Sequence, residues 1–282
     1  MEKQELRQSM ESRLLRLGEL LKVSYGLINE RFGSFLGLTL LVYIPVNVVL
    51  YVKMLQVDPT VEDAALMLNQ AMSVSVVQLI LVFIEIVAVL VTAVLVHNQV
   101  YGEQKIPFGT AFYRGIRMWV RAVTALVLVM LGAFLCLIPL GSLLALPGLF
   151  GMMLPLIALV SVYYSMMQNM VCCAAALRGH WGLHNLRYSF FILRGYMGRA
   201  FGRMLVISLI TSGISMLFEQ LLANIVSFLT QPWLYVLICT AFSALISVLN
   251  TFGFIAASVL FLNLEEIKIQ EVREADRHSN GE

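Results

Sequence analysis

The residue best placed for chemistry in this sequence is a lone carboxyl group, Glu85, inside the otherwise uncharged apolar stretch 74–96. A charge near the middle of a bilayer costs at least about 2.5 kcal/mol, so an intramembrane carboxyl is a functional candidate by default. Such a group could carry a proton or a cation, or anchor a polar headgroup. Gln78, two turns earlier, shares its helix face. The structural alternative is a protonated Glu85 that shares hydrogen bonds with neighbouring helices.

Other polar side chains within apolar stretches form a second group of candidates. Four of them, spaced so that they partly share a helix face, are Tyr163, Tyr164, Gln168 and Asn169. They could line a cavity with Glu85, but we favour a role in joining helices. Glu219 lies toward the outer end of its apolar stretch, where it could reach the interface or pair with Lys53.

A basic segment between two apolar stretches offers a phosphate-binding surface. Arginine and hydroxyl groups beside a bilayer can bind lipid phosphate, and the candidates are Arg187, Ser189, Arg194 and Arg199. The topology of a membrane protein also gathers arginines on one side of the bilayer without any binding function. We therefore expect lipid contact here and leave specific recognition open.

No residues have the spacing of a catalytic or metal site. His180 and His184 are four residues apart but lack the intervening Glu of the zinc-protease motif and a third ligand. The four cysteines lie in apolar runs, as small buried hydrophobes do. We expect no metal and no cofactor, and we favour a non-enzymatic protein over an enzyme.

The composition indicates which elements position these residues. Of 282 residues, 60% are hydrophobic and only 13% are charged, against ~25% charged in soluble domains. The mean hydropathy is +0.85, so a soluble fold would lack polar surface. The net charge of +2 is too small to indicate nucleic-acid binding. The composition predicts an all-α, polytopic membrane bundle.

The apolar stretches predict six membrane-spanning helices, since one crossing needs about 20 residues. The spans are expected at about 33–54, 74–96, 120–140, 147–177, 203–229 and 233–263. The uncharged run 122–177 is too long for one crossing. It is divided by residues that favour a tight turn, namely Pro139, Gly141, Pro147 and Gly148.

The basic residues predict the orientation of the bundle. Of the 19 Lys and Arg residues, only Lys53 falls outside the two tails and the second and fourth connections. Because positive residues are retained on the cytoplasmic side, both termini are expected to be cytoplasmic, in a cell (inner) membrane. One missed span would destroy this bias, so the bias supports the count of six.

The basic segments before the first, third and fifth spans suggest a threefold repeat. Each places apolar residues at helical spacing opposite basic ones, at 2–31, weakly at 108–119, and at 183–201. We predict three units of an interfacial helix followed by a membrane hairpin. The corresponding domains are a cytoplasmic amphipathic helix 1–32, a membrane domain 33–264 and a polar tail 265–282. Gly-x-x-x-Gly at Gly33–Gly37 and Gly198–Gly202 predicts close helix approach.

Several short motifs resemble a known family. They are Leu186-Arg187-Tyr188-Ser189, Leu193-Arg194-Gly195 and Arg199 before span five, Pro147-Gly148 before span four, and the closing segment 259–265. Together they resemble the bacterial six-span proteins grouped as the membrane domain of glycerophosphoryl diester phosphodiesterase, in its stand-alone form. The resemblance implies a fold and a membrane setting. It implies no reaction, because the phosphodiesterase chemistry belongs to a separate soluble barrel.

Three functions are compatible with these features. The first is a non-enzymatic membrane protein that binds or organises membrane lipid, or supports a membrane protein partner. The second is a transporter, channel or lipid-translocating protein that uses Glu85, which requires a cavity reaching that residue. The third is a membrane-embedded lipid-modifying enzyme, which requires clustered carboxylates or histidines at one depth. Glu85 and Glu219 are expected at different depths, which counts against the third. The amphipathic segments, the missing catalytic set and the short loops favour the first. The oligomeric state stays open.

Overall fold

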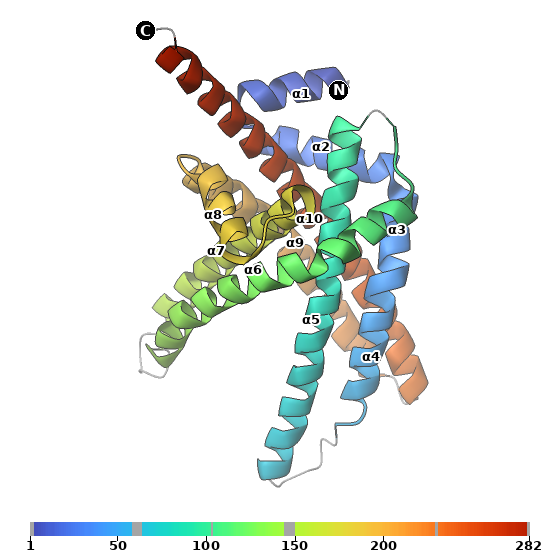
Figure 1. Cartoon of the computed structure of the whole chain (residues 1–282). Coiled ribbons are helices and arrows are strands. Elements are labelled where there is room, and N and C mark those ends of the chain that lie inside the picture. The colour runs from blue at the N-terminus through green and yellow to red at the C-terminus, as the bar shows by residue number, and fades with distance from the viewer. Residues whose placement is uncertain (1–2, 58–63, 103, 144–149, 229–230, 281–282) are drawn as a thin grey trace.

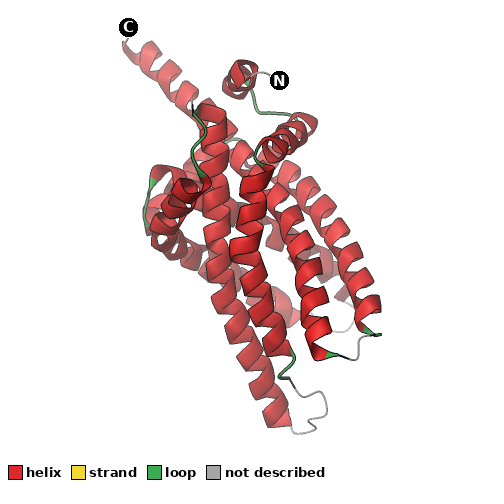
Figure 2. Cartoon of the chain, turned by 90° about the vertical axis from the view of Figure 1, so that its right-hand side faces the viewer, coloured by secondary structure: helices red, strands yellow, loops and turns green. Residues whose placement is uncertain are grey.

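The computed structural model describes residues 3–57, 64–102, 104–143, 150–228 and 231–280 (Figure 1). Within these ranges the chain is helical and has no β-strand (Figure 2). The elements are α1 (Lys3–Ser12), α2 (Leu17–Glu30), α3 (Phe32–Leu38), η1 (Thr39–Tyr43), α4 (Ile44–Met54), α5 (Ala64–Tyr101), α6 (Phe108–Leu143), α7 (Phe150–Arg178), α8 (Gly182–Leu193), α9 (Met197–Val226) and α10 (Pro232–Asn280). The predicted all-α class is confirmed.

Six helical stretches of the described residues are long and apolar enough to cross a membrane. They are Phe32–Met54, Leu68–Tyr101, Phe108–Pro139, Pro155–Arg178, Met197–Val226 and Pro232–His278. Each coincides with a predicted span and most extend beyond it, because a helix does not end where the hydrocarbon ends. Pro147 and Gly148, from the predicted turn between spans three and four, lie outside the described residues.

The first span changes helical type before a proline. Pro45 has no N–H to donate to the preceding turn, and its ring crowds that turn. The turn before it, η1, is π-helical, and Pro45 then lies in the first turn of α4. A π turn inserts an extra residue into a helix. The span therefore stays helical past its proline.

The N-terminal amphipathic segment is two helices, which corrects the single helix predicted at 1–32. The helix is interrupted at residues 13–16, between α1 and α2. There Arg16 donates its backbone N–H to Glu19 Oε2 at 2.8 Å, and Arg13 pairs with Glu19 Oε1 at 2.6 Å. The Arg16 backbone N–H and the Arg13 guanidinium lower the pKa of Glu19. The ionised carboxylate therefore fixes the start of α2.

One amide side chain attaches these helices to the rest of the bundle. Asn263 of α10 is fully buried. Its Nδ2 donates to the carbonyls of Met10 and Arg13 at 2.8 and 2.9 Å. Its Oδ1 accepts the N–H of Leu15 at 2.8 Å. The segment between α1 and α2 is thus bound in place by the end of the sixth span.

Two predicted segments prove continuous with neighbouring spans. The weak amphipathic segment 108–119 is the first part of α6, and the expected polar tail from residue 265 is the last part of α10. Only the first and third repeat units therefore have separate helices before their hairpins, namely α1 and α2, and α8. Figure 1 shows α10 projecting past the other helices at the end that carries both termini.

Helices α5 and α6 approach each other closely at Gly115. A Cβ added at Gly115 would lie 2.6 Å from Val91 Cγ2 and 3.2 Å from the Val91 backbone N. The two predicted Gly-x-x-x-Gly motifs make no such close contact. Gly33, Gly198 and Gly202 have open space around their Cβ positions, and a Cβ at Gly37 would meet only the Phe108 ring, at 3.6 Å. The close approach therefore uses a single glycine outside those motifs.

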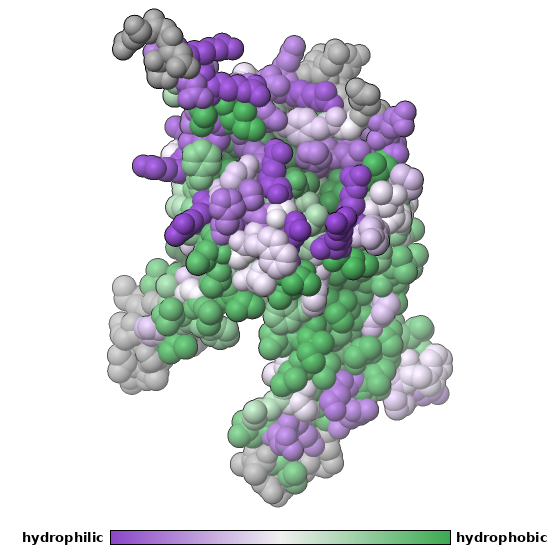
Figure 3. All heavy atoms as spheres, viewed as in Figure 1, coloured by the Kyte–Doolittle hydropathy of each residue, from purple (hydrophilic) through white to green (hydrophobic). Residues whose placement is uncertain are grey.

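The bundle is joined at one end and open at the other. We call the end with both termini, α1, α2 and α8 the basic end; its hydrophilic surface is visible in Figure 3. Away from it the α6–α7 hairpin diverges from α4 and α5, and a hollow separates them (Figures 1 and 3). In the most apolar stretch of α5, 61% of the residues are buried inside the bundle, whereas the corresponding share in α9 is 6%. Helix α5 is therefore central and α9 peripheral.

Candidate functional site

Glu85 lies in the central helix, α5, next to the part of that helix that is buried inside the bundle. Leu81, Ala88 and Thr92, which share its helix face, are buried. The carboxyl of Glu85 is itself half-buried and lies within electrostatic range of the phenol of Tyr43. No hydrogen bond to Glu85 is formed by another described side chain. The described group on which the charge of Glu85 acts is therefore a tyrosine of the first span and not a second carboxylate.

Tyr43 belongs to a seam of polar side chains between the first and sixth spans. On η1 and α4 the seam contains Thr39, Tyr43, Asn47 and Tyr51, four residues apart. On α10 it contains Thr240, Ser243, Ser247 and Thr251. The two sides meet where the hydroxyls of Tyr51 and Ser243 lie 2.5 Å apart. Sequence reasoning missed this seam, although its spacing of four residues was visible.

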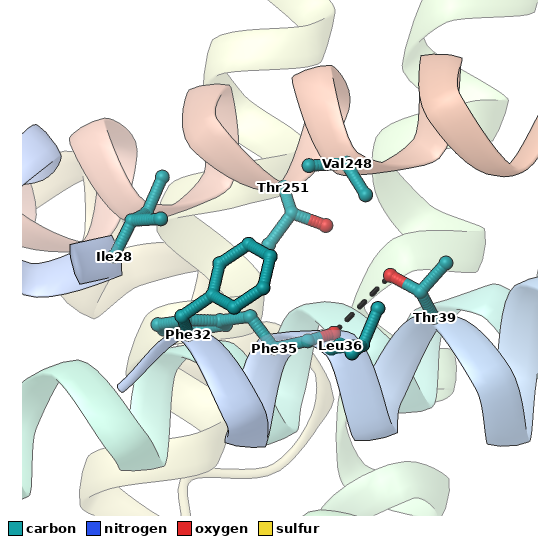
Figure 4. Close-up of a pocket in the computed structure, with 7 residues that line it drawn as sticks. All are labelled: Ile28, Phe32, Phe35, Leu36, Thr39, Val248 and Thr251. Carbon is teal, nitrogen blue, oxygen red and sulfur yellow. Dashed lines mark hydrogen bonds between the residues drawn. The ribbon is translucent and has the colours of Figure 1, made fainter. Parts of the chain in front are cut away.

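Four of the eight seam side chains hydrogen-bond within their own span. Thr39 donates to Phe35 O at 3.1 Å, and Thr251 donates to Ser247 O at 2.8 Å. Both hydroxyls line a small cavity of about 20 Å³ between α3 and α10, otherwise walled by Ile28, Phe32, Phe35, Leu36 and Val248 (Figure 4). A cavity of that size holds about one water molecule. The seam therefore has room for a water but no open channel at this point.

Gln78 and Glu219 lie apart from Glu85. Both are exposed on the bundle surface, so Gln78 faces outward although sequence spacing places it near the same stripe. Glu219 lies within electrostatic range of Tyr51, at the other end of the seam. Lys53, the proposed partner of Glu219, donates to Gln56 Oε1 at 3.1 Å. The two intramembrane carboxyls thus interact with different tyrosines.

The polar patch of the fourth span faces α6 and α8 instead of Glu85. Tyr163 and Tyr164 line a cavity of about 160 Å³ together with Gly132 of α6 and Leu186 and Phe190 of α8. Tyr164 donates to Cys136 Sγ at 3.2 Å. Asn169 is buried and donates to Ser165 O at 3.0 Å, and Gln168 is half-buried. The structure separates this patch from Glu85, as expected if it joins helices.

The predicted phosphate-binding residues divide into exposed arginines and a buried serine. Arg187, Arg194 and Arg199 are exposed. Ser189 is fully buried, and its hydroxyl donates to Asn185 O at 3.0 Å. The helical period explains the difference, because Ser189 lies on the face of α8 that packs against the bundle. The surface therefore offers guanidinium groups without this hydroxyl.

An ion pair between a partly exposed arginine and a buried glutamate holds α8 and α10 against the end of α7. Arg178 Nε and Nη2 donate to the two oxygens of Glu265 at 2.7 and 2.8 Å. The hydroxyl of Tyr188 also donates to Glu265. Burial raises the pKa of Tyr188, and the bond to Glu265 raises it further. The phenol therefore stays a donor at ordinary pH. Sequence reasoning placed Glu265 in a family-like segment but gave it no partner.

The turn that leads into α8 depends on a glycine. Gly179 has φ +66°, and a Cβ there would lie 2.6 Å from Arg121 Nη1. Arg121 donates to Gly179 O at 3.0 Å, and its guanidinium stacks 5.2 Å from the centre of the Trp181 ring. The left-handed backbone and the close arginine both favour glycine. This contact sets the direction in which α8 leaves α7.

Comparisons with protein-family models, with curated proteins and with solved structures give no match to this chain. The function is therefore argued from the geometry of these sites.

Proposed function

We propose that this chain is a non-enzymatic, multi-pass membrane protein that binds anionic lipid through its basic end. In this proposal the basic end faces the cytoplasm, so that its arginines meet the headgroups of the inner leaflet. A membrane protein partner on the same surface is compatible with it. The resemblance to the six-span membrane domain family agrees with such a role and stays a prediction.

The observation that carries the proposal is the surface of α8. Its exposed residues combine Arg187 and Arg194 with apolar side chains, of which Leu183 is 61% and Phe191 46% exposed. An apolar surface left open beside guanidinium groups is the pattern of a helix that lies at a membrane interface. Anionic headgroups would meet the arginines while the apolar side chains enter the acyl boundary.

The carboxyl groups favour this proposal over a lipid-modifying enzyme. General acid–base chemistry on a lipid ester needs groups that face one reacting bond. Glu85 lies near Tyr43, and Glu219 lies near Tyr51. Because the two tyrosines are two helical turns apart, the carboxyls do not form a pair.

Lipid retention by purified protein tests the proposal. The protein would be reconstituted in nanodiscs of mixed phosphatidylglycerol and phosphatidylcholine, and co-purifying lipid would be counted by native mass spectrometry. A variant with Arg187, Arg194 and Arg199 changed to Gln should lose several-fold enrichment of the anionic lipid. The matched control changes Arg273 and Arg277, exposed on the projecting end of α10. Equal enrichment in the variant and wild type, or no enrichment in either, would sink the proposal.

The second candidate is a transporter or lipid-translocating protein that uses Glu85. The observation in its favour is the polar seam, which places hydroxyl groups along the first and sixth spans next to that carboxyl. Proton flux, ion flux and lipid scrambling would be measured in liposomes, with Glu85→Gln beside Glu219→Gln as the control. Loss of flux only in Glu85→Gln would favour this function. Equal flux in both variants and wild type would remove Glu85 from the mechanism.

A further inference from the structure

A polar cavity lies at the basic end between α5, α6 and α7. It measures about 260 Å³. Its wall consists of Val94, His97, Asn98, Tyr101, Gly102, Arg114, Ala176 and Leu177. The volume is just below the value of about 300 Å³ at which pockets for drug-sized ligands start, so the cavity has room for a small polar group. None of its residues was a candidate from the sequence.

Two of the polar wall residues are free to bind a ligand. Arg114 forms no ion pair with a described carboxylate, and His97 makes a ring contact with Tyr101 but no hydrogen bond to a described side chain. Asn98 is committed, because its Oδ1 accepts from Arg31 at 2.8 Å and from the Ile106 N–H at 3.0 Å. The available groups are therefore a guanidinium and an imidazole, from two helices.

The charges around the cavity favour an anion beside Arg114 and His97. The guanidinium of Arg178 also lies within electrostatic range of His97. Its partner Glu265 is held by two hydrogen bonds from that arginine and one from Tyr188. Three carboxylates, those of Glu266, Glu265 and Glu11, act on the Tyr101 side of the wall, where the Arg7 guanidinium stacks 5.6 Å from the same ring. Among the described charges that act on His97, the carboxylate of Glu265 offsets the guanidinium of Arg178, so Arg114 supplies the net positive charge on this side of the cavity.

The depth of the cavity indicates where such an anion comes from. His97 follows the predicted end of the second span by one residue, and Leu177 is the predicted end of the fourth. The cavity therefore lies at the level where a span leaves the hydrocarbon, which is the level of lipid phosphates. Gly115 lets α6 cross tightly over Val91, and this crossing places Arg114 over the cavity.

We propose that this cavity binds a terminal phosphate group, with Arg114 and His97 as the donors to its oxygens. The inference rests on the proposed lipid-binding function and adds a headgroup-specific site to the general basic surface. Guanidinium groups bind phosphate through two parallel hydrogen bonds, and a second donor on another helix fixes the orientation. A phosphatidic acid headgroup and free phosphate share this chemistry, and the experiment distinguishes them.

The test compares two arginines one turn apart on α6. Both arginines are exposed, and only Arg114 lines the cavity. Binding of phosphatidic acid would be measured in phosphatidylcholine nanodiscs, with inorganic phosphate as competitor. Arg114→Gln should weaken binding about tenfold, as expected for loss of a charge-assisted bond, while Arg117→Gln should change it less than twofold. His97→Gln should also weaken it, and Arg114→Lys should give an intermediate affinity.

The possible outcomes distinguish the phosphate site at Arg114 from the general lipid-binding function. Competition by inorganic phosphate identifies free phosphate as a ligand, and binding that resists it identifies the lipid headgroup; both support the site. Equal affinities of Arg114→Gln and Arg117→Gln overturn the site and leave the general lipid function standing. If Arg114→Gln does not fold, equal affinities of Arg114→Lys, His97→Gln and wild type overturn the site. Absence of anionic lipid binding in wild type overturns the proposed function as well.

Discussion

The Oδ1 atom of Asn263 accepts a hydrogen bond from the backbone N–H of Leu15 at 2.8 Å, although the two residues are 248 positions apart. Because the same side chain donates to Met10 and Arg13, one residue at the end of the sixth span satisfies three backbone groups of the N-terminal segment. A helix break buried beside α10 would otherwise leave those groups without partners.

Asn263→Asp should release the N-terminal helices from the bundle. The aspartate keeps the acceptor for Leu15 but loses both donors, so two backbone carbonyls lose their partner. Leaving buried polar groups unsatisfied costs about 1–3 kcal/mol each. We expect a lower midpoint of thermal unfolding and faster proteolysis between α1 and α2. Glu274→Gln, at an exposed residue of the same helix beyond the predicted end of the span, serves as control. Unchanged proteolysis in Asn263→Asp would contradict the attachment.

Gly115→Ala should destabilise the bundle. The added Cβ would lie 2.6 Å from Val91 Cγ2, and forcing extra atoms into a packed contact costs about 1–3 kcal/mol. Gly202→Ala is the matched control, because nothing lies within 4 Å of its Cβ position and alanine is the better helix former by about 1 kcal/mol. Thermal unfolding in detergent should move in opposite directions. Val91→Ala should partly rescue Gly115→Ala, and failure to do so would locate the strain elsewhere.

The two partners of the Arg178–Glu265 ion pair, of which only Glu265 is buried, should respond differently to substitution. Arg178→Met leaves the carboxylate of Glu265, which is 3% exposed, with Tyr188 as its remaining donor. Breaking a buried pair costs about 3–5 kcal/mol, and we expect the low end because Arg178 is partly hydrated. Glu265→Gln should cost less, since no unpaired charge is buried. Equal losses of unfolding free energy would show that the pair contributes packing and no electrostatic stabilisation.

Acidification should loosen the turn between α7 and α8. Burial lowers the pKa of His180, and His184 and Arg178 lower it further. A histidine with a lowered pKa contributes stability that is complete above its unfolded pKa of about 6.5 and is lost as the pH falls. Proteolysis of this turn should therefore increase as the pH falls from about 7.5 to about 5.5, which is about one unit on either side of that pKa. The increase should be smaller in His180→Asn. An identical pH response in both proteins would assign the effect to other groups.

The sequence by itself determined the spans and their number. An uncharged run of about 20 residues is a local property that lowers the free energy of a helix in hydrocarbon whatever its neighbours are. For the same reason the amphipathic segments before the first and fifth spans were recognisable. The ends of the helices were harder to predict from the sequence. Segment 108–119 continues into α6 and the tail continues α10, and a helix outside the bilayer depends on tertiary support.

Only the tertiary structure decided which polar groups meet. The spacing of Gln78 and Glu85 suggested a shared site, yet Gln78 faces outward and Glu85 approaches Tyr43 of another span. Arg178 and Glu265, or Leu15 and Asn263, carry no sign of their pairing in the sequence. The cavity beside Arg114 exists because Gly115 allows α6 to cross over Val91. Hydrophobicity is additive along the chain, whereas a partner for a buried polar group is supplied by the packing of distant helices.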